Sequence, residues 1–207
     1  MSRTVMRLSP LFFVLAASGC SLLSAPELPK TRYFVLTSDR HQSLSEGTDS
    51  QPKISVGIGP FTFPAYLGRN QMVSRTETNQ IVFNQFDRWA EPVSAGFLRV
   101  LSEDVGRAVG TNQVVLFPWY QIPLEYQVKG EILRFESNQS EGTAVLEGIW
   151  TIYRPSDKKY LLTREANLRQ SVSTASPEEV AAALSGLVSE LGQEIGRTLK
   201  QMHRSGQ

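Results

Sequence analysis

The sequence has very few of the residues from which catalytic and metal sites are built. Cysteine occurs once, at Cys20, so an internal disulfide is excluded. The two histidines, His41 and His203, are far apart, and no Cys-x-x-Cys or His-x-x-x-His spacing occurs, so a transition-metal site has too few ligands. The Gly-x-Ser-x-Gly signature of hydrolases is also missing. These absences predict a protein that is not an enzyme and binds neither a metal nor a dissociable cofactor.

An excess of charge of one sign is missing as well. Lys and Arg total 21 against 20 for Asp and Glu, and two of the cations, Arg3 and Arg7, lie at the very start of the chain. This balance gives no electrostatic signature of binding to nucleic acid, which is therefore not an expected partner. Long apolar runs are missing too, since none approaches the roughly 20 residues that span a bilayer.

The start of the chain has the pattern of a lipoprotein signal peptide. Arg3 and Arg7 precede an apolar run over residues 8–17. Ala-Ser-Gly-Cys at residues 17–20 resembles the lipobox of bacterial lipoproteins, in which small side chains precede the lipidated cysteine. We therefore expect residues 1–19 to be removed, and Cys20 to carry a diacylglycerol and an N-linked acyl chain such as palmitate. The alternative is an ordinary secretory signal or an uncleaved apolar anchor, with Cys20 incidental.

The residues after Cys20 indicate where the protein is held. Two or three acyl chains are enough for stable anchoring, at about 0.8 kcal/mol per buried methylene. By analogy with enterobacterial sorting, an aspartate after the cysteine favours the inner membrane, so Ser21 indicates the outer membrane. Residues 20–31 contain two prolines and are expected to form a lipidated tether, and residues 32–207 suit one periplasmic domain.

Hydrophobic patterning predicts an α+β fold with a mainly antiparallel sheet and two helices packed on one of its faces. Residues 93–109 have an apolar stripe typical of a helix, with Pro92 in its first turn. The last helix begins with a capping box of Ser176 and Glu179. The segments predicted as strands are 33–37, one starting at residue 53 whose regular part ends at Pro60 and Pro64, 72–76, 80–83, 114–117, 126–136, 143–153 and 160–172.

Three further features of the helices carry specific expectations. Gly192 and Gly196 favour close packing of the last helix against the sheet over a membrane dimer motif, because charged residues surround them. Glu103 and Asp104 are expected on the solvated side of their helix. His203 is expected in a frayed C-terminal tail.

Two aromatic segments, residues 61–67 and 117–123, are too rich in proline for regular strands and too apolar for ordinary solvated loops. Such segments often form interfaces, although core packing or loop anchoring is the alternative for each. The candidate partner-interface residues are Phe61, Phe63, Tyr66, Leu67, Arg69, Phe117, Trp119 and Tyr120.

Two motifs, Tyr-Leu-Gly-Arg-Asn-Gln at residues 66–71 and Arg-Trp-Ala-Glu at residues 88–91, resemble those of the PqiC family of ABC-type transport auxiliary lipoproteins. The first is similar to the family's Tyr-Leu-Asp-Arg-Pro-Gln, with Gly68 and Asn70 as departures. The second matches fully. The expected role of this second motif is structural, with Trp89 in the core beneath the first helix and Glu91 near that helix's positive end; a binding site is the alternative. The structural motif comprises Arg88, Trp89, Glu91 and Pro92.

The resemblance implies an outer-membrane subunit of an MCE-type intermembrane lipid transport system. Such a subunit docks the periplasmic tunnel formed by an MCE-domain protein and supports envelope integrity without covalent chemistry. A ring-shaped homo-oligomer suits the end of a ring-shaped tunnel. The alternatives are a monomeric periplasmic lipoprotein that carries or accepts a lipid, and an envelope hydrolase whose catalytic residues form no known motif.

Overall fold

The computed structural model describes residues 29–38, 54–173 and 176–206. The predicted leader, Cys20, most of the tether and His41 lie outside the described residues. The chain divides into two compact units, Met1–Lys30 and Thr31–Gln207. Only Pro29 and Lys30 of the first unit are described, so the fold below is that of the second.

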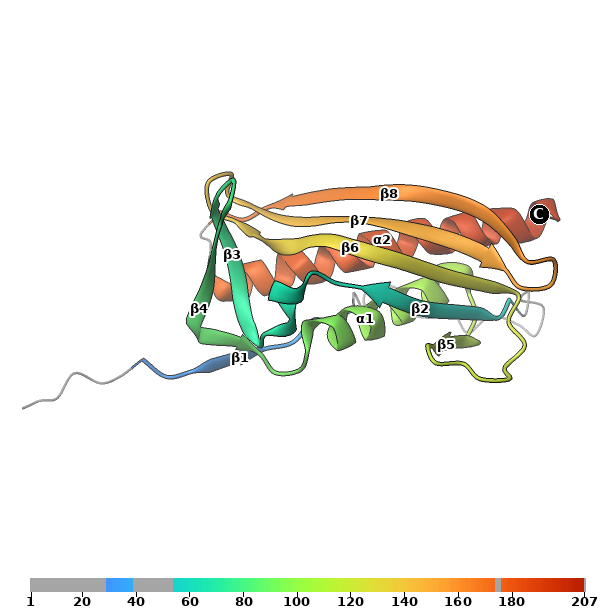
Figure 1. Ribbon diagram of the computed structural model, residues 1–207, viewed down its shortest axis with the longest axis horizontal. Helices are drawn as coiled ribbons and strands as arrows, with labels where there is room; N and C mark the ends of the chain where they lie inside the picture. Colours follow the sequence, from blue (N-terminus) through green and yellow to red (C-terminus); the bar gives the residue numbers. More distant parts are fainter. Residues whose placement is uncertain (1–28, 39–53, 174–175, 207) are drawn as a thin grey trace, which may run out of the picture. The chain divides into compact units, whose positions relative to one another are not determined.

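The described residues form one mixed sheet of eight strands. It is built around β6 (Tyr126–Asn138), as Figure 1 shows. Along one edge, β6 pairs antiparallel with β7 (Thr143–Arg154), which pairs antiparallel with β8 (Lys159–Ser171). The predicted meander is therefore confirmed. Along its other edge, β6 pairs in parallel with β2 (Val56–Thr62) near its start and with β3 (Gln71–Glu77) near its end.

Two branches extend the sheet from β2 and β3. Strand β2 also pairs in parallel with β5 (Val114–Leu116). Strand β3 forms the predicted hairpin with β4 (Gln80–Trp89), and β4 pairs in parallel with β1 (Arg32–Phe34). The regular pairing of β2 breaks at Pro60, as predicted, because the register shifts between Ile58 and Phe61 and the proline has no regular ladder position to fill; the strand then ends at Thr62, before Pro64.

Two helices, α1 (Val93–Val109) and α2 (Pro177–Ser205), cover one face of the sheet (Figure 1). The α+β class is confirmed. The cap of α2 forms as predicted, since Ser176 Oγ accepts a hydrogen bond of 3.2 Å from the Glu179 N–H. Neither helix, nor the short 3-10 helix η1 (Ala65–Gly68), is long and apolar enough to cross a membrane, and the described residues contain no other helix.

The core between the sheet and the helices is filled by aromatic and branched side chains. Phe97 of α1 lies at its centre, with its ring 5.5 Å from that of Phe135 in β6. The largest fully buried side chains are Trp150, Tyr126, Phe97, Leu36, Ile54, Ile58, Leu101, Ile132, Leu146, Ile152, Leu184 and Leu187. Phe97 and Leu101 lie on the predicted apolar stripe of residues 93–109, so the pattern that identifies this helix in the sequence also builds the core.

The contact between α1 and α2 corrects two predictions. A Cβ added at Gly192 would lie 2.7 Å from Asp104 Cβ, and one at Gly196 would lie 2.4 Å from Ala108 Cβ. The two glycines therefore pack against α1, and the prediction that they pack against the sheet was wrong. Asp104 was predicted to be solvated but is buried, because it faces α2 and accepts a 2.6 Å hydrogen bond from Ser189.

Burial raises the pKa of the Asp104 carboxyl above its ordinary value. The hydrogen bond from Ser189 and the ion pair with Arg107, one turn further along α1, oppose this shift without cancelling it. The prediction of a frayed tail at His203 was also wrong. This residue lies in the last turn of α2, and its Nδ1 is 2.6 Å from Glu125 Oε1.

Candidate docking surfaces

The first predicted interface segment packs mainly inward. The rings of Phe61 and Phe63 lie 6.0 and 5.4 Å from that of Phe97, and Leu67 is buried in η1. Gly130 makes room for Phe61, because a Cβ there would lie 2.4 Å from its ring. Arg69 is exposed, and its guanidinium lies 4.7 Å from the centre of the Phe83 ring. The segment therefore fixes the β2–β3 connection onto α1.

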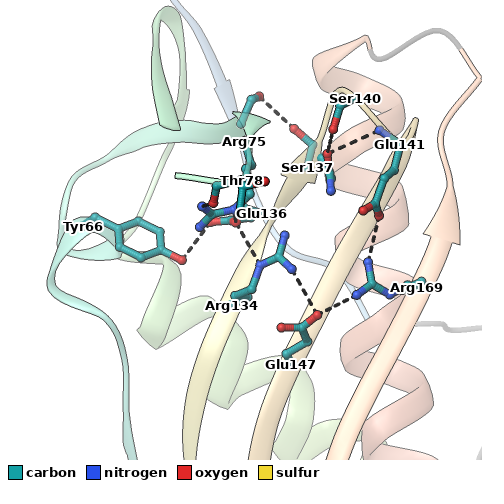
Figure 2. Close-up of polar contacts among 12 residues, drawn as sticks. Tyr66, Arg75, Thr78, Arg134, Glu136, Ser137, Ser140, Glu141, Glu147 and Arg169 are labelled. Carbon is teal, nitrogen blue, oxygen red and sulfur yellow. Dashed lines mark hydrogen bonds and ion pairs between the residues drawn. The ribbon is translucent and has the colours of Figure 1, made fainter. Parts of the chain in front are cut away.

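Tyr66 joins a network of charged residues that Figure 2 shows in close-up. Its hydroxyl donates a 2.8 Å hydrogen bond to Glu136, a fully buried carboxylate. Glu136 also accepts hydrogen bonds from Arg75 Nε at 2.6 Å and from Arg134 Nε at 3.2 Å. Burial, and next the hydrogen bond to Glu136, raise the pKa of Tyr66, so this hydroxyl remains a proton donor.

The network crosses the sheet from β3 to β8. Arg134 Nη1 lies 3.1 Å from Glu147, and Arg169 bonds to Glu147 at 2.8 Å and to Glu141 at 2.9 Å (Figure 2). These side chains lie on the face opposite the helices, since their neighbours Phe135 and Leu146 belong to the core. Three arginines balance three glutamates here, so the network links four strands and leaves no net charge to attract an ion.

The second predicted interface segment is exposed. We call residues 116–124, which run from the last residue of β5 almost to the start of β6, the aromatic loop. The large apolar side chains that this loop exposes are Leu116 (39% exposed), Phe117 (49%), Tyr120 (82%) and Ile122 (44%). Sequence reasoning singled out Phe117 and Tyr120 but not Leu116 or Ile122, because an irregular loop has no periodicity that separates exposed from buried positions.

The aromatic loop is held in shape by β2. A Cβ at Gly57 would lie 2.6 Å from Leu124 and 2.9 Å from the Trp119 ring, so both side chains rest on bare backbone. The Trp119 ring also contacts that of Phe117 edge to face at 5.3 Å. Gln121 has a φ of 61°, a left-handed conformation that a non-glycine residue keeps only where its surroundings impose it. The exposed side chains therefore project from an ordered platform.

The residues of the Arg-Trp-Ala-Glu motif lie where β4 leads into α1. Trp89 is buried in the core, and Pro92 is the N-cap residue of α1. Glu91 accepts a 2.7 Å hydrogen bond from Arg99 Nη2, which also donates to the Leu36 carbonyl at 2.9 Å. Arg88 Nε is buried without a hydrogen-bond partner among the described residues. This geometry ties β1, β4 and α1 together at one corner.

The sequence profile of the ABC-type transport auxiliary lipoprotein component family matches residues 34–196. The chain belongs to this family. The match covers strands β2 to β8, the last residue of β1, the aromatic loop, the charged network and most of α2. Within the described ranges, no group of three His, Cys, Asp or Glu side chains of this auxiliary lipoprotein is arranged to hold a metal ion.

Solved structures share the fold of this auxiliary lipoprotein. One, of an uncharacterized protein, has a TM-score of 0.67 and 15% identity over 83% of this chain and 99% of that chain. Another, of protein XCC0632 from Xanthomonas campestris, has a TM-score of 0.64 and 13% identity over 86% of this chain and 100% of that chain. No curated protein matches the chain by sequence. At these identities the similarity shows the fold alone.

Proposed function

We propose that this auxiliary lipoprotein is a non-enzymatic subunit of an MCE-type intermembrane lipid transport system. Lipids on Cys20 anchor it to the periplasmic face of the outer membrane. There it docks the end of the tunnel formed by an MCE-domain protein, as part of a homo-oligomeric ring, and supports envelope integrity. The family match, which is to a transport auxiliary component, supports this proposal at the level of the transporter class.

The aromatic loop is the observation that carries the docking role. Exposed apolar side chains grouped in one loop are typical of protein interfaces. Because Trp119 and Leu124 already fix the loop on β2, little conformational entropy is lost when a partner covers its exposed side chains. A lipid carrier instead needs space between the sheet and the helices, where Phe97 packs against Phe61, Phe63 and Phe135.

Purification from cross-linked cell envelopes tests the proposal. The lipidated chain carries an affinity tag, a Cys20→Ser variant serves as the unanchored control, and mass spectrometry identifies the proteins recovered. We expect an MCE-domain protein that is enriched with the anchored form, and a purified assembly heavier than a monomer. A monomer that carries stoichiometric lipid and no transport protein would contradict the docking role and favour a carrier.

A further inference from the structure

Helix α2 runs from β1, where the tether enters the domain, to Glu125, which directly follows the aromatic loop. Near its start, Glu178 accepts a 2.7 Å hydrogen bond from Arg32 of β1. Near its end, His203 contacts Glu125, the residue directly before β6, at 2.6 Å. At 1.5 Å per residue, the helix holds these two contacts about 38 Å apart. The aromatic loop therefore lies at the end of the domain away from β1 (Figure 1).

Three segments meet at this end, which we call the distal end: the aromatic loop, residues 154–160 and residues 197–205. Pairing of Tyr153 with Gln127 and with Tyr160 brings the β7–β8 turn to the start of β6. Tyr160 is 71% exposed, and its ring lies 5.1 Å from that of Tyr153. The distal end therefore adds another exposed aromatic side chain to those of the aromatic loop.

The distal end carries unneutralised positive charge. The carboxylates in and beside it are already engaged: Glu125, which directly follows the aromatic loop, lies 2.6 Å from His203, and Asp157 accepts a hydrogen bond from Arg154 Nη2 at 2.6 Å, which holds the pKa of Asp157 at about 2. The cations that have no acidic partner among the described residues are Lys158, Arg197, Lys200 and Arg204. The last three line a surface depression of about 460 Å³ together with Gln201 and Ser205.

We propose that the distal end is the surface that binds the transport partner, an inference that rests on the proposed function. Its occupant is a protein segment whose apolar side chains are flanked by carboxylates. The aromatic loop and Tyr160 bind the apolar side chains, and the four cations pair with the carboxylates, which orients the segment and excludes basic ones. Position favours a protein over the anchoring membrane, because the tether enters the domain about 38 Å away along α2.

Site-specific photo-cross-linking tests this surface in the lipidated full chain. A photoreactive amino acid replaces Tyr120 at the distal end or, as a control, Asn167, which is exposed in the middle of β8. After irradiation in cell envelopes, the cross-linked peptides are sequenced. We expect adducts at position 120 and not at position 167, formed with an Asp- or Glu-rich segment of a periplasmic protein of the transport system.

Charge variants test the role of the cations. Lys200→Glu with Arg204→Glu should lower the adduct yield at position 120 about fivefold, while Lys200→Arg with Arg204→Lys should preserve it. Equal yields at positions 120 and 167, a partner segment without carboxylates, or adducts with phospholipid would overturn the proposal. So would binding of the purified chain to phosphatidylglycerol vesicles that the Glu variants abolish, because the cations would then serve a lipid surface.

The two proposals fail in different ways. If the affinity purification recovers an MCE-domain protein but its cross-links form at position 167, the proposed function stands and the distal-end proposal is wrong. If no MCE-domain protein is recovered, while position 120 cross-links to an acidic segment of another transporter's periplasmic protein, the distal-end surface stands and the MCE assignment is wrong.

Discussion

Replacing Gly196 with alanine tests whether α1 and α2 touch backbone to backbone. The new Cβ would lie 2.4 Å from Ala108 Cβ and 3.2 Å from the Val105 carbonyl oxygen. Both atoms are fixed to α1, so neither can move aside without moving the helix. Gly186 on the same helix is the matched control, because the nearest atom to its added Cβ is the end of the flexible Gln170 side chain, at 2.8 Å.

The expected magnitude follows from two opposing effects. Alanine is better than glycine inside a helix by about 1 kcal/mol, and this gain is common to both variants. Carbon atoms pack at about 3.5–4.0 Å, so α1 and α2 must separate locally by more than about 1 Å at Gly196. Overpacking of this kind costs about 1–3 kcal/mol. Gly186→Ala should therefore exceed Gly196→Ala in free energy of unfolding by about 1–3 kcal/mol.

Urea unfolding of the chain from Ser21 onward measures this difference, provided that the slopes with denaturant agree. Adding Ala108→Gly to Gly196→Ala removes the closest contact, so a double-mutant cycle should show a favourable coupling between the two changes. Equal stability of Gly186→Ala and Gly196→Ala, with no coupling to position 108, would refute the tight crossing of α1 and α2.

Three other substitutions have defined outcomes. Folding raises the pKa of Asp104 above its value of about 4 in the unfolded chain. The wild type should therefore lose stability relative to Asp104→Asn as the pH rises from about 4 through the folded pKa. Unfolding curves at several pH values measure how the free energy of unfolding of each protein changes with pH. Glu136→Gln should lower the free energy of unfolding by about 2–3 kcal/mol, because it leaves the charges of Arg75 and Arg134 largely buried without this carboxylate. The exposed control Glu141→Gln should lower it by less than about 0.5 kcal/mol, and equal losses would contradict the buried network. Gly57→Ala should displace Trp119 and speed proteolysis of the aromatic loop, whereas Gly68→Ala, which has nothing within 4 Å of its Cβ, should leave both the tryptophan emission and the cleavage rate unchanged.

The elements of the fold could be predicted from the sequence where local pattern decides them. Helix α1 has the predicted bounds, and the Ser176 cap, the β3–β4 hairpin and the β6–β8 meander all form, because periodicity and turn chemistry act over neighbouring residues. The parallel pairings of β6 with β2 and β3 join residues far apart in the chain, and no local pattern encodes them.

Whether a polar side chain is buried depends on which element packs against it, so the prediction from sequence was wrong for Asp104. Asp104 and its neighbour Glu103 have the same local pattern, yet only Asp104 is turned toward α2. Composition also says nothing about how charge is distributed over the surface. The chain is close to neutral, but contacts such as that between His203 and Glu125, 78 residues apart, engage the carboxylates near the distal end, while Lys200 and its neighbouring cations have no acidic partner among the described residues.

The two aromatic segments show why a candidate site could be proposed but not chosen from the sequence. Both combine prolines with large rings, but residues 61–67 continue β2 across α1, where the Phe97 ring receives Phe61 and Phe63. The aromatic loop instead packs on the backbone of β2 at Gly57, where there is room for Trp119 and Leu124. The rings of Phe117 and Tyr120 remain exposed. The same composition therefore gives an anchor where a complementary helix is present and an exposed surface where only glycine backbone is available.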